Sequence, residues 1–155
     1  MKAVVSGSYD PFTLGHLDVV TRASQLFDEV LVAVGVNIGK YSMFDMDTRV
    51  AMALEAVSNL NRVSVAPMEG LLVDFCRLHG ASVVVRGARS GADFDAEWAM
   101  ARMNSSLSGI ETIIVPAAGE VSFISSTLVR QIVKAGGDCS GYVPEGVLRV
   151  MKKEL

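Results

Sequence analysis

Short apolar runs alternate along this chain with longer segments of helical spacing. The apolar runs, which have the composition of buried strands, are Ala3–Val5, Val30–Val36, Val63–Ala66, Val83–Arg86 and Thr112–Val115. Apolar residues recur at intervals of three and four in the other segments, at about His16–Phe27, Thr48–Asn59, Leu71–His79, Asp93–Leu107, Ser126–Ala135 and Glu145–Lys153. This alternation predicts one α/β domain over residues 1–155, with helices on both faces of a five-stranded parallel sheet.

The loops after the predicted strands are expected to meet at one rim of the sheet. Ligands of such sheets bind beyond the carboxyl ends of the strands. These loops are polar and rich in glycine, at Ser6–Ser8, Asn37–Lys40, Pro67–Leu72, Arg86–Arg89 and Pro116–Ser126. Their convergence predicts a ligand site at this rim.

Charge and composition narrow the class of ligand. The 155 residues carry a net charge of −3, and their basic residues form no block. A nucleic-acid surface usually needs a basic patch, so we expect no nucleic-acid partner. The positive residues Lys40, Arg86, Arg89 and Arg130 stand instead at predicted turns, which favours a small anionic ligand, although any one of them could simply line a loop.

The chain has no sign of a membrane segment. No apolar stretch reaches the ~18 residues typical of a span, and Met1 leads at once into the first predicted strand. We therefore expect a cytoplasmic protein with no membrane partner. Cys76 and Cys139 have no neighbours at metal-ligand spacing, so we expect neither a disulfide nor a zinc site.

The turn after the first predicted strand, residues 6–16, has the most specific sequence motif, SGSYDPFTLGH. A helix N-terminus attracts anions, glycine allows a phosphate close to the backbone, and His16 adds a hydrogen-bond donor. The alternative is an ordinary Gly/Asp/Pro turn with a capping histidine. The following helix directs Leu17, Val20, Ala23 and Leu26 to the core, so we expect its packing not to depend on the His16 side chain.

Two further segments suit phosphate binding. Arg86 and Arg89 flank a glycine at a strand end, where they could clamp phosphate or pair with Asp93 or Asp95. Residues 122–127 place hydroxyl groups at a helix start, where capping alone could explain them. Residues 34–41 imitate a Walker A loop but have the wrong glycine spacing, so Lys40 is better interpreted as a flexible point charge over the site.

Two of these motifs resemble signatures of the nucleotidyltransferase superfamily. Thr13-Leu14-Gly15-His16 resembles its (H/T)-x-G-H motif, and residues 124–130 resemble its Ile-Ser-Ser-Thr-x-x-Arg motif. From Lys2 to Leu155 the chain resembles the bacterial phosphopantetheine adenylyltransferase family, which implies a single-domain Rossmann-like nucleotidyltransferase fold. Positions that depart from the family pattern are Ser6, Ser8, Ala88, Ala96, Trp98 and Val121.

The resemblance implies a reaction of ATP with 4′-phosphopantetheine that gives dephospho-coenzyme A and pyrophosphate by in-line attack, without a general base. It assigns transition-state stabilisation to His16, and it places phosphopantetheine against Ser8, Lys40, Leu72 and Arg86. It places ATP against Ser8, Tyr9, His16, Gly87, Ala88, Arg89, Glu97, Val121, Ser122, Phe123, Ile124, Ser125, Ser126 and Thr127. Mg²⁺ is the implied cofactor, with no protein ligand assigned to it, and the implied assembly is a homohexamer formed by two trimers.

Other functions remain open at this point. Nicotinate-mononucleotide and cytidylyl transferases usually have His at the first position of the (H/T)-x-G-H motif, whereas this chain has Thr13. One of these two kinds of transferase is the second enzyme hypothesis. A nucleotide sensor without catalysis is the hypothesis from another class. Independently of the resemblance, the mean hydropathy of +0.38 and the methionines near Met100–Leu107 predict self-association.

Overall fold

The computed structural model describes residues 1–36 and 38–155 and has the predicted alternation of strands and helices. Asn37, in the predicted Asn37–Lys40 loop, lies outside the described residues. The strands are β1 (Lys2–Gly7), β2 (Glu29–Gly35), β3 (Val63–Met68), β4 (Val83–Ala88) and β5 (Glu111–Pro116). The helices are α1 (Leu14–Leu26), α2 (Met46–Val57), α3 (Leu72–Leu78), α4 (Gly91–Ser108), α5 (Ser126–Lys134) and α6 (Glu145–Glu154).

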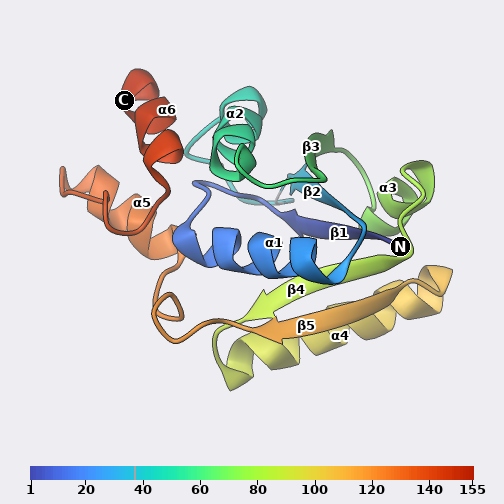
Figure 1. The fold of residues 1–155 in the computed structure, drawn as a ribbon. Coiled ribbons are helices and arrows are strands. Elements are labelled where there is room, and N and C mark those ends of the chain that lie inside the picture. Colours follow the sequence, from blue (N-terminus) through green and yellow to red (C-terminus); the bar gives the residue numbers. More distant parts are fainter. Residues whose placement is uncertain (37) are drawn as a thin grey trace.

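All five strands form one parallel sheet in the order β3-β2-β1-β4-β5. Helices α1 and α2 cover one face, with α6 packed on α2, whereas α3 and α4 lie on the other face (Figure 1). The predicted α/β fold class is therefore confirmed. Because the strand order reverses direction at β1 and β4, the loops after these two strands diverge and leave a crevice between them.

Side chains of the central strands alternate between two cores. Val5 of β1 and Val85 of β4 belong to the core under α1 and α2, whereas Val4 belongs to the core under α3. The continuous apolar runs of β1, β2 and β4 thus fit burial on both faces, as the sequence predicts. The edge strands β3 and β5 are only partly buried, which corrects the expectation of double burial for them.

Local chemistry explains where the helices begin and end. The Ser90 hydroxyl accepts a hydrogen bond from the Asp93 N–H, so α4 begins two residues before the predicted start at Asp93. Gly136, at φ +73°, follows the end of α5, as expected of a helix C-terminus. Leu26 is 66% exposed at the last turn of α1, so its prediction as a core residue is wrong.

A close contact sets the position of α1 over the crevice. A Cβ atom on Gly87 would lie 2.7 Å from Cγ2 of Val19 in α1. Only a residue without a side chain therefore lets α1 approach the end of β4 this closely. Cys76 of α3 is buried in the core under that helix. Within the described residues, no helix combines the length and the apolar character needed to cross a membrane.

Candidate active site

A cavity of about 350 Å³ lies at the crevice between the ends of β1 and β4. Its walls come from the loops after β1, β4 and β5 and from the segment before α2. The predicted site residues that line it are Ser8, Tyr9, His16, Lys40, Arg86, Gly87, Arg89, Glu97, Ile124, Ser125, Ser126 and Thr127. The fold thus brings together side chains from segments that are more than a hundred residues apart in the chain.

A second cavity, of about 370 Å³, adjoins the first. Leu72 of the predicted set lines it, together with apolar groups of Met68 and Met100. The two cavities share the wall residues Ser6, Gly7, Ser8, Arg86 and Glu97. The guanidinium group of Arg86, the hydroxyl groups of Ser6 and Ser8 and the carboxylate of Glu97 therefore stand where the contents of both cavities would meet.

Four predicted residues line neither of these two cavities, namely Ala88, Val121, Ser122 and Phe123. Ala88 is buried, and its carbonyl accepts the Ala117 N–H at 2.8 Å. The Val121 carbonyl accepts the Ile124 N–H at 3.1 Å. These bonds, with the one from the Ser122 hydroxyl to the Gly119 carbonyl, shape the loop after β5, whereas Phe123 is exposed.

The hydrogen bonds of His16 determine its tautomer. The Thr13 N–H donates to Nδ1 of His16 at 2.9 Å, and the Thr13 hydroxyl accepts from the His16 N–H, so the two residues form a reciprocal cap on α1. An Nδ1 atom that accepts a hydrogen bond carries no proton, so the proton of the neutral ring is on Nε2. His16 thus presents an N–H donor at the cavity that it lines.

Burial, together with the positive charges of Arg86 and Arg89, lowers the pKa of His16 from 6.5 to about 3, and burial is the largest of these causes. The imidazole is therefore neutral at physiological pH. Since the unfolded chain keeps the ordinary value, protonation of His16 favours unfolding. Its contribution to stability is present above pH 6.5 and decreases as the pH falls toward 3.

The packing of His16 corrects one expectation from the sequence. Its ring lies edge-on to Tyr9 and Phe12, with centroids 4.9 and 5.4 Å away. The ring is thus part of an aromatic cluster as well as of the helix cap. We expect its removal to lower stability, because the Thr13 N–H would lose its acceptor and the aromatic cluster would lose one ring.

Arg86 forms a two-pronged ion pair across the shared wall. Its Nε and Nη2 atoms donate to the two carboxylate oxygens of Glu97 at 2.8 and 2.9 Å. Its Nη1 atom donates to the carbonyl and hydroxyl oxygens of Ser6. The guanidinium is therefore held in one orientation, with a carboxylate of the predicted ATP set as its partner.

Arg89 also pairs with a carboxylate. Its Nε atom and its backbone N–H both donate to Asp93, at 2.9 and 3.0 Å, and its Nη1 atom donates to the Ile124 carbonyl. Both arginines thus pair with carboxylates, which is the alternative to phosphate binding that the sequence left open. The partner of Arg89 is Asp93 rather than Asp95. Both arginines nevertheless line the cavity.

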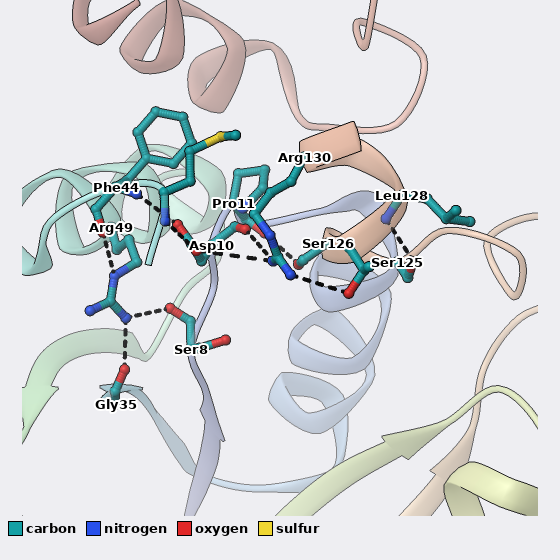
Figure 2. Close-up of polar contacts among 12 residues, drawn as sticks. Ser8, Asp10, Pro11, Gly35, Phe44, Arg49, Ser125, Ser126, Leu128 and Arg130 are labelled. Carbon is teal, nitrogen blue, oxygen red and sulfur yellow. Dashed lines mark hydrogen bonds and ion pairs between the residues drawn. The ribbon is translucent and has the colours of Figure 1, made fainter. Parts of the chain in front are cut away.

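The start of α5 is attached to the turn after β1. Ser125 caps the helix by accepting the Leu128 N–H, as predicted. The Ser126 hydroxyl donates to the Pro11 carbonyl at 2.8 Å, and Arg130 donates to the Asp10 carbonyl at 2.8 Å (Figure 2). These bonds place the first turn of α5 at the edge of the cavity, which Ser125, Ser126 and Thr127 line.

Two buried charged residues organise the same turn from its other side (Figure 2). The Asp10 carboxylate accepts the N–H groups of Met43 and Phe44, at 2.8 and 2.9 Å. Arg49 of α2 donates to the carbonyl oxygens of Ser8, Gly35 and Phe44. Sequence reasoning missed Arg49, although an arginine on the apolar face of a predicted helix is a recognisable signal.

The described residues contain no cluster of three or more His, Cys, Asp or Glu side chains that could hold a metal ion. Mg²⁺ commonly binds through substrate phosphates, water and one or two carboxylates rather than through a protein cage. The carboxylates of Glu97 and Asp93 also line the cavity, where they are paired with Arg86 and Arg89.

Comparison with known proteins agrees with this geometry. The family model described as cytidylyltransferase-like matches residues 4–132. A candidate nicotinate-nucleotide adenylyltransferase structure from Vibrio parahaemolyticus has a TM-score of 0.72 and 21% identity, covers 99% of this chain and 92% of that one, and therefore supports the fold alone. Fold and family match define the class as cytidylyltransferase-like nucleotidyltransferases.

Relatives with higher identity refine this class. A phosphopantetheine adenylyltransferase of Cutibacterium acnes is 53% identical over 144 residues, which are 93% of this chain and 92% of that protein. Another, of Frankia casuarinae, is 44% identical over an alignment of 158 positions that covers 99% of this chain and 98% of that protein. The chain therefore belongs to the phosphopantetheine adenylyltransferase family.

The state of His16 can be tested by nuclear magnetic resonance. We expect its imidazole to stay neutral, with the proton on Nε2, from pH 8 down to pH 5, because its pKa is about 3. The measurement is a titration of the ring ¹⁵N shifts. The chain has two histidines, so a His79→Gln variant assigns the signals. A His16 midpoint above pH 6 would contradict the lowered pKa, and a neutral ring protonated on Nδ1 would contradict the tautomer.

Proposed function

We propose that this chain transfers the adenylyl group of ATP to 4′-phosphopantetheine and releases dephospho-coenzyme A and pyrophosphate, a step of coenzyme A biosynthesis. The observation that carries the proposal is the pair of adjoining cavities with Ser8 and Arg86 in their common wall. A reaction between two phosphorylated substrates needs both sites side by side, with cationic groups where the phosphates meet. The names of the relatives supply the identity of the two substrates.

The reaction needs no general base. An oxygen of the 4′-phosphate is already anionic, so it attacks the α-phosphorus of ATP directly. The bond from the α-phosphorus to the bridging oxygen of the β-phosphate breaks, and that oxygen leaves with pyrophosphate. His16 donates its Nε2–H to an α-phosphate oxygen, where negative charge develops in the transition state. Positioning and charge stabilisation provide the rest of the catalysis.

The acceptor is assigned to the second cavity and its junction with the first. Arg86 and Ser8 in the common wall contact the acceptor phosphate, and Lys40 at the rim reaches the same phosphate as a flexible cation. Leu72 contacts the pantetheine arm in the second cavity. The Glu97 partner keeps Arg86 oriented before the phosphate arrives.

ATP is assigned to the first cavity. Arg89 and the N–H groups at the start of α5 face its phosphates, and Tyr9, Gly87 and Glu97 complete the walls. Ala88 and residues 121–123 act by shaping the loops around the nucleotide. We propose that Mg²⁺ accompanies ATP, held mainly by the nucleotide phosphates, and that it reduces their negative charge when bound.

Pyrophosphate release tests the reaction. We expect the purified chain to release pyrophosphate when it is mixed with ATP, Mg²⁺ and 4′-phosphopantetheine, and to form dephospho-coenzyme A in equal amount. Nicotinate mononucleotide in place of phosphopantetheine, and cytidine triphosphate in place of ATP, test the other transferase hypotheses. Nucleotide binding without pyrophosphate release from any acceptor would favour the sensor hypothesis instead.

Replacement of His16 separates its chemical role from its cap. We expect His16→Ala to lower kcat by about 10²- to 10³-fold, because a preorganised transition-state donor is lost. ATP binding should weaken much less, since the contact gains strength as charge develops. Val73→Ala, in the core on the other face of the sheet, is the control for reduced stability. If His16→Ala kept a near-normal kcat, His16 would be a capping residue only.

Self-association is proposed from the surface of α4. Of its eighteen residues only Asn104 is buried, whereas Phe94 and Trp98 along one edge and Met100, Met103 and Leu107 along the other are exposed. This apolar surface supports assembly into a homohexamer of two trimers, the form that the resemblance implies. Light scattering at micromolar concentration should give about six times the 16.5 kDa chain mass. A stable monomer would rule this assembly out.

We further propose that the reaction takes place in the cytoplasm. Cys76 and Cys139 are buried free thiols, which suit a reducing compartment.

A further inference from the structure

Arg49 is a buried cation without a carboxylate partner among the described residues. Arg49 is only 3% exposed and lies on the core-facing side of α2, together with Met52 and Ala53. An apolar side chain would suit this position better, because burial of an unpaired charge is costly. The compensation comes from three carbonyl oxygens, those of Phe44 at 3.1 Å and of Ser8 and Gly35 at 2.7 Å each.

The bond to Ser8 determines how the site's backbone faces the cavity. In a planar trans peptide the carbonyl and the following N–H point in opposite directions. When Arg49 holds the Ser8 carbonyl, the Tyr9 N–H is therefore directed away from Arg49. Ser8 and Tyr9 line the first cavity, whereas Arg49 does not. Figure 2 shows Arg49 between the carbonyl groups of Ser8 and Gly35.

This backbone conformation needs external support. Tyr9 has φ +51°, in the left-handed region that a non-glycine residue rarely adopts. The Tyr9 ring is fixed on one side, where it stacks on Phe12 at 4.9 Å and its hydroxyl donates to the Val5 carbonyl. Arg49 supplies the contact on the other side of the peptide. Its bond to Gly35 also fixes the end of β2, five residues before Lys40.

We infer that Arg49 is a positioning residue for adenylyl transfer: it orients the Ser8–Tyr9 peptide so that the Ser8 side chain and the Tyr9 N–H meet the reacting phosphates. The inference rests on the proposed function. Arg49 contacts neither substrate, and its fork of N–H donors, rather than its charge, performs the role. A misplacement of about 1 Å in such a site costs about 100-fold in rate.

The test compares two variants of Arg49 with a control on the same helix. Arg49→Lys keeps the charge but loses the fork, and Arg49→Met keeps the bulk but loses both. We expect each to lower kcat by about 30- to 100-fold while the KM values for ATP and phosphopantetheine change by less than about fivefold. Met52→Ala, which creates a cavity one turn further along α2, should lower the melting temperature and leave kcat near normal.

A second measurement is independent of activity. In Arg49→Lys, the amide resonance of Tyr9 should shift, whereas that of Cys76, in the core under α3, should not. If Arg49→Lys had normal kcat and an unchanged Tyr9 resonance, the inference would be wrong. It would also be wrong if Met52→Ala lost as much kcat as Arg49→Met. An inactive wild-type chain would contradict the proposed function itself, whereas an active wild type with normal Arg49→Lys kinetics contradicts only this inference.

Discussion

The buried carboxylate of Asp10 is the interaction on which the geometry of the site depends. It accepts the N–H groups of Met43 and Phe44, while its own backbone carbonyl accepts from Arg130 in α5. One residue in the turn after β1 therefore connects the segment that enters α2 with the first turn of α5. A carboxylate that is only 4% exposed is stable there because these N–H groups and the nearby guanidinium of Arg130 compensate its lost hydration. Loops from distant parts of the chain consequently share one fixed point.

The charges at the rim are arranged before any phosphate binds. Glu97 and Asp93 hold Arg86 and Arg89 in place, so the orientation of both guanidinium groups is fixed before a substrate binds. The same two cations, together with burial, keep His16 neutral. The site thus combines fixed positive charges with a neutral donor, which gives up no proton when it contacts an anion. This arrangement suits a reaction in which charge moves between phosphate oxygens and no proton transfer is required.

Much of the fold follows from the sequence, because the apolar runs and helical repeats are local signals. The strands, the loops that follow them and the cap at Ser125 were all predictable in this way. The partners of the site residues were not. Arg86 pairs with Glu97 and Arg49 binds the Ser8 carbonyl 41 positions away in the sequence, and only tertiary packing decides such contacts. Leu26 was misassigned because periodicity does not reveal that the last turn of α1 extends past the core.

The strand order gives the two cavities their different surroundings. The first extends from the shared wall toward α1 and α5, whereas the second extends toward the ends of β2 and β3 and toward α4. An in-line displacement requires the attacking and leaving oxygens on opposite sides of the phosphorus. Substrates that enter from two different groups of loops and meet at Arg86 can satisfy this requirement without a large movement of either one. With the acceptor in the second cavity and ATP in the first, as proposed, the reversal of strand order at β1 and β4 places the approach of the acceptor and the departure of pyrophosphate at different groups of loops.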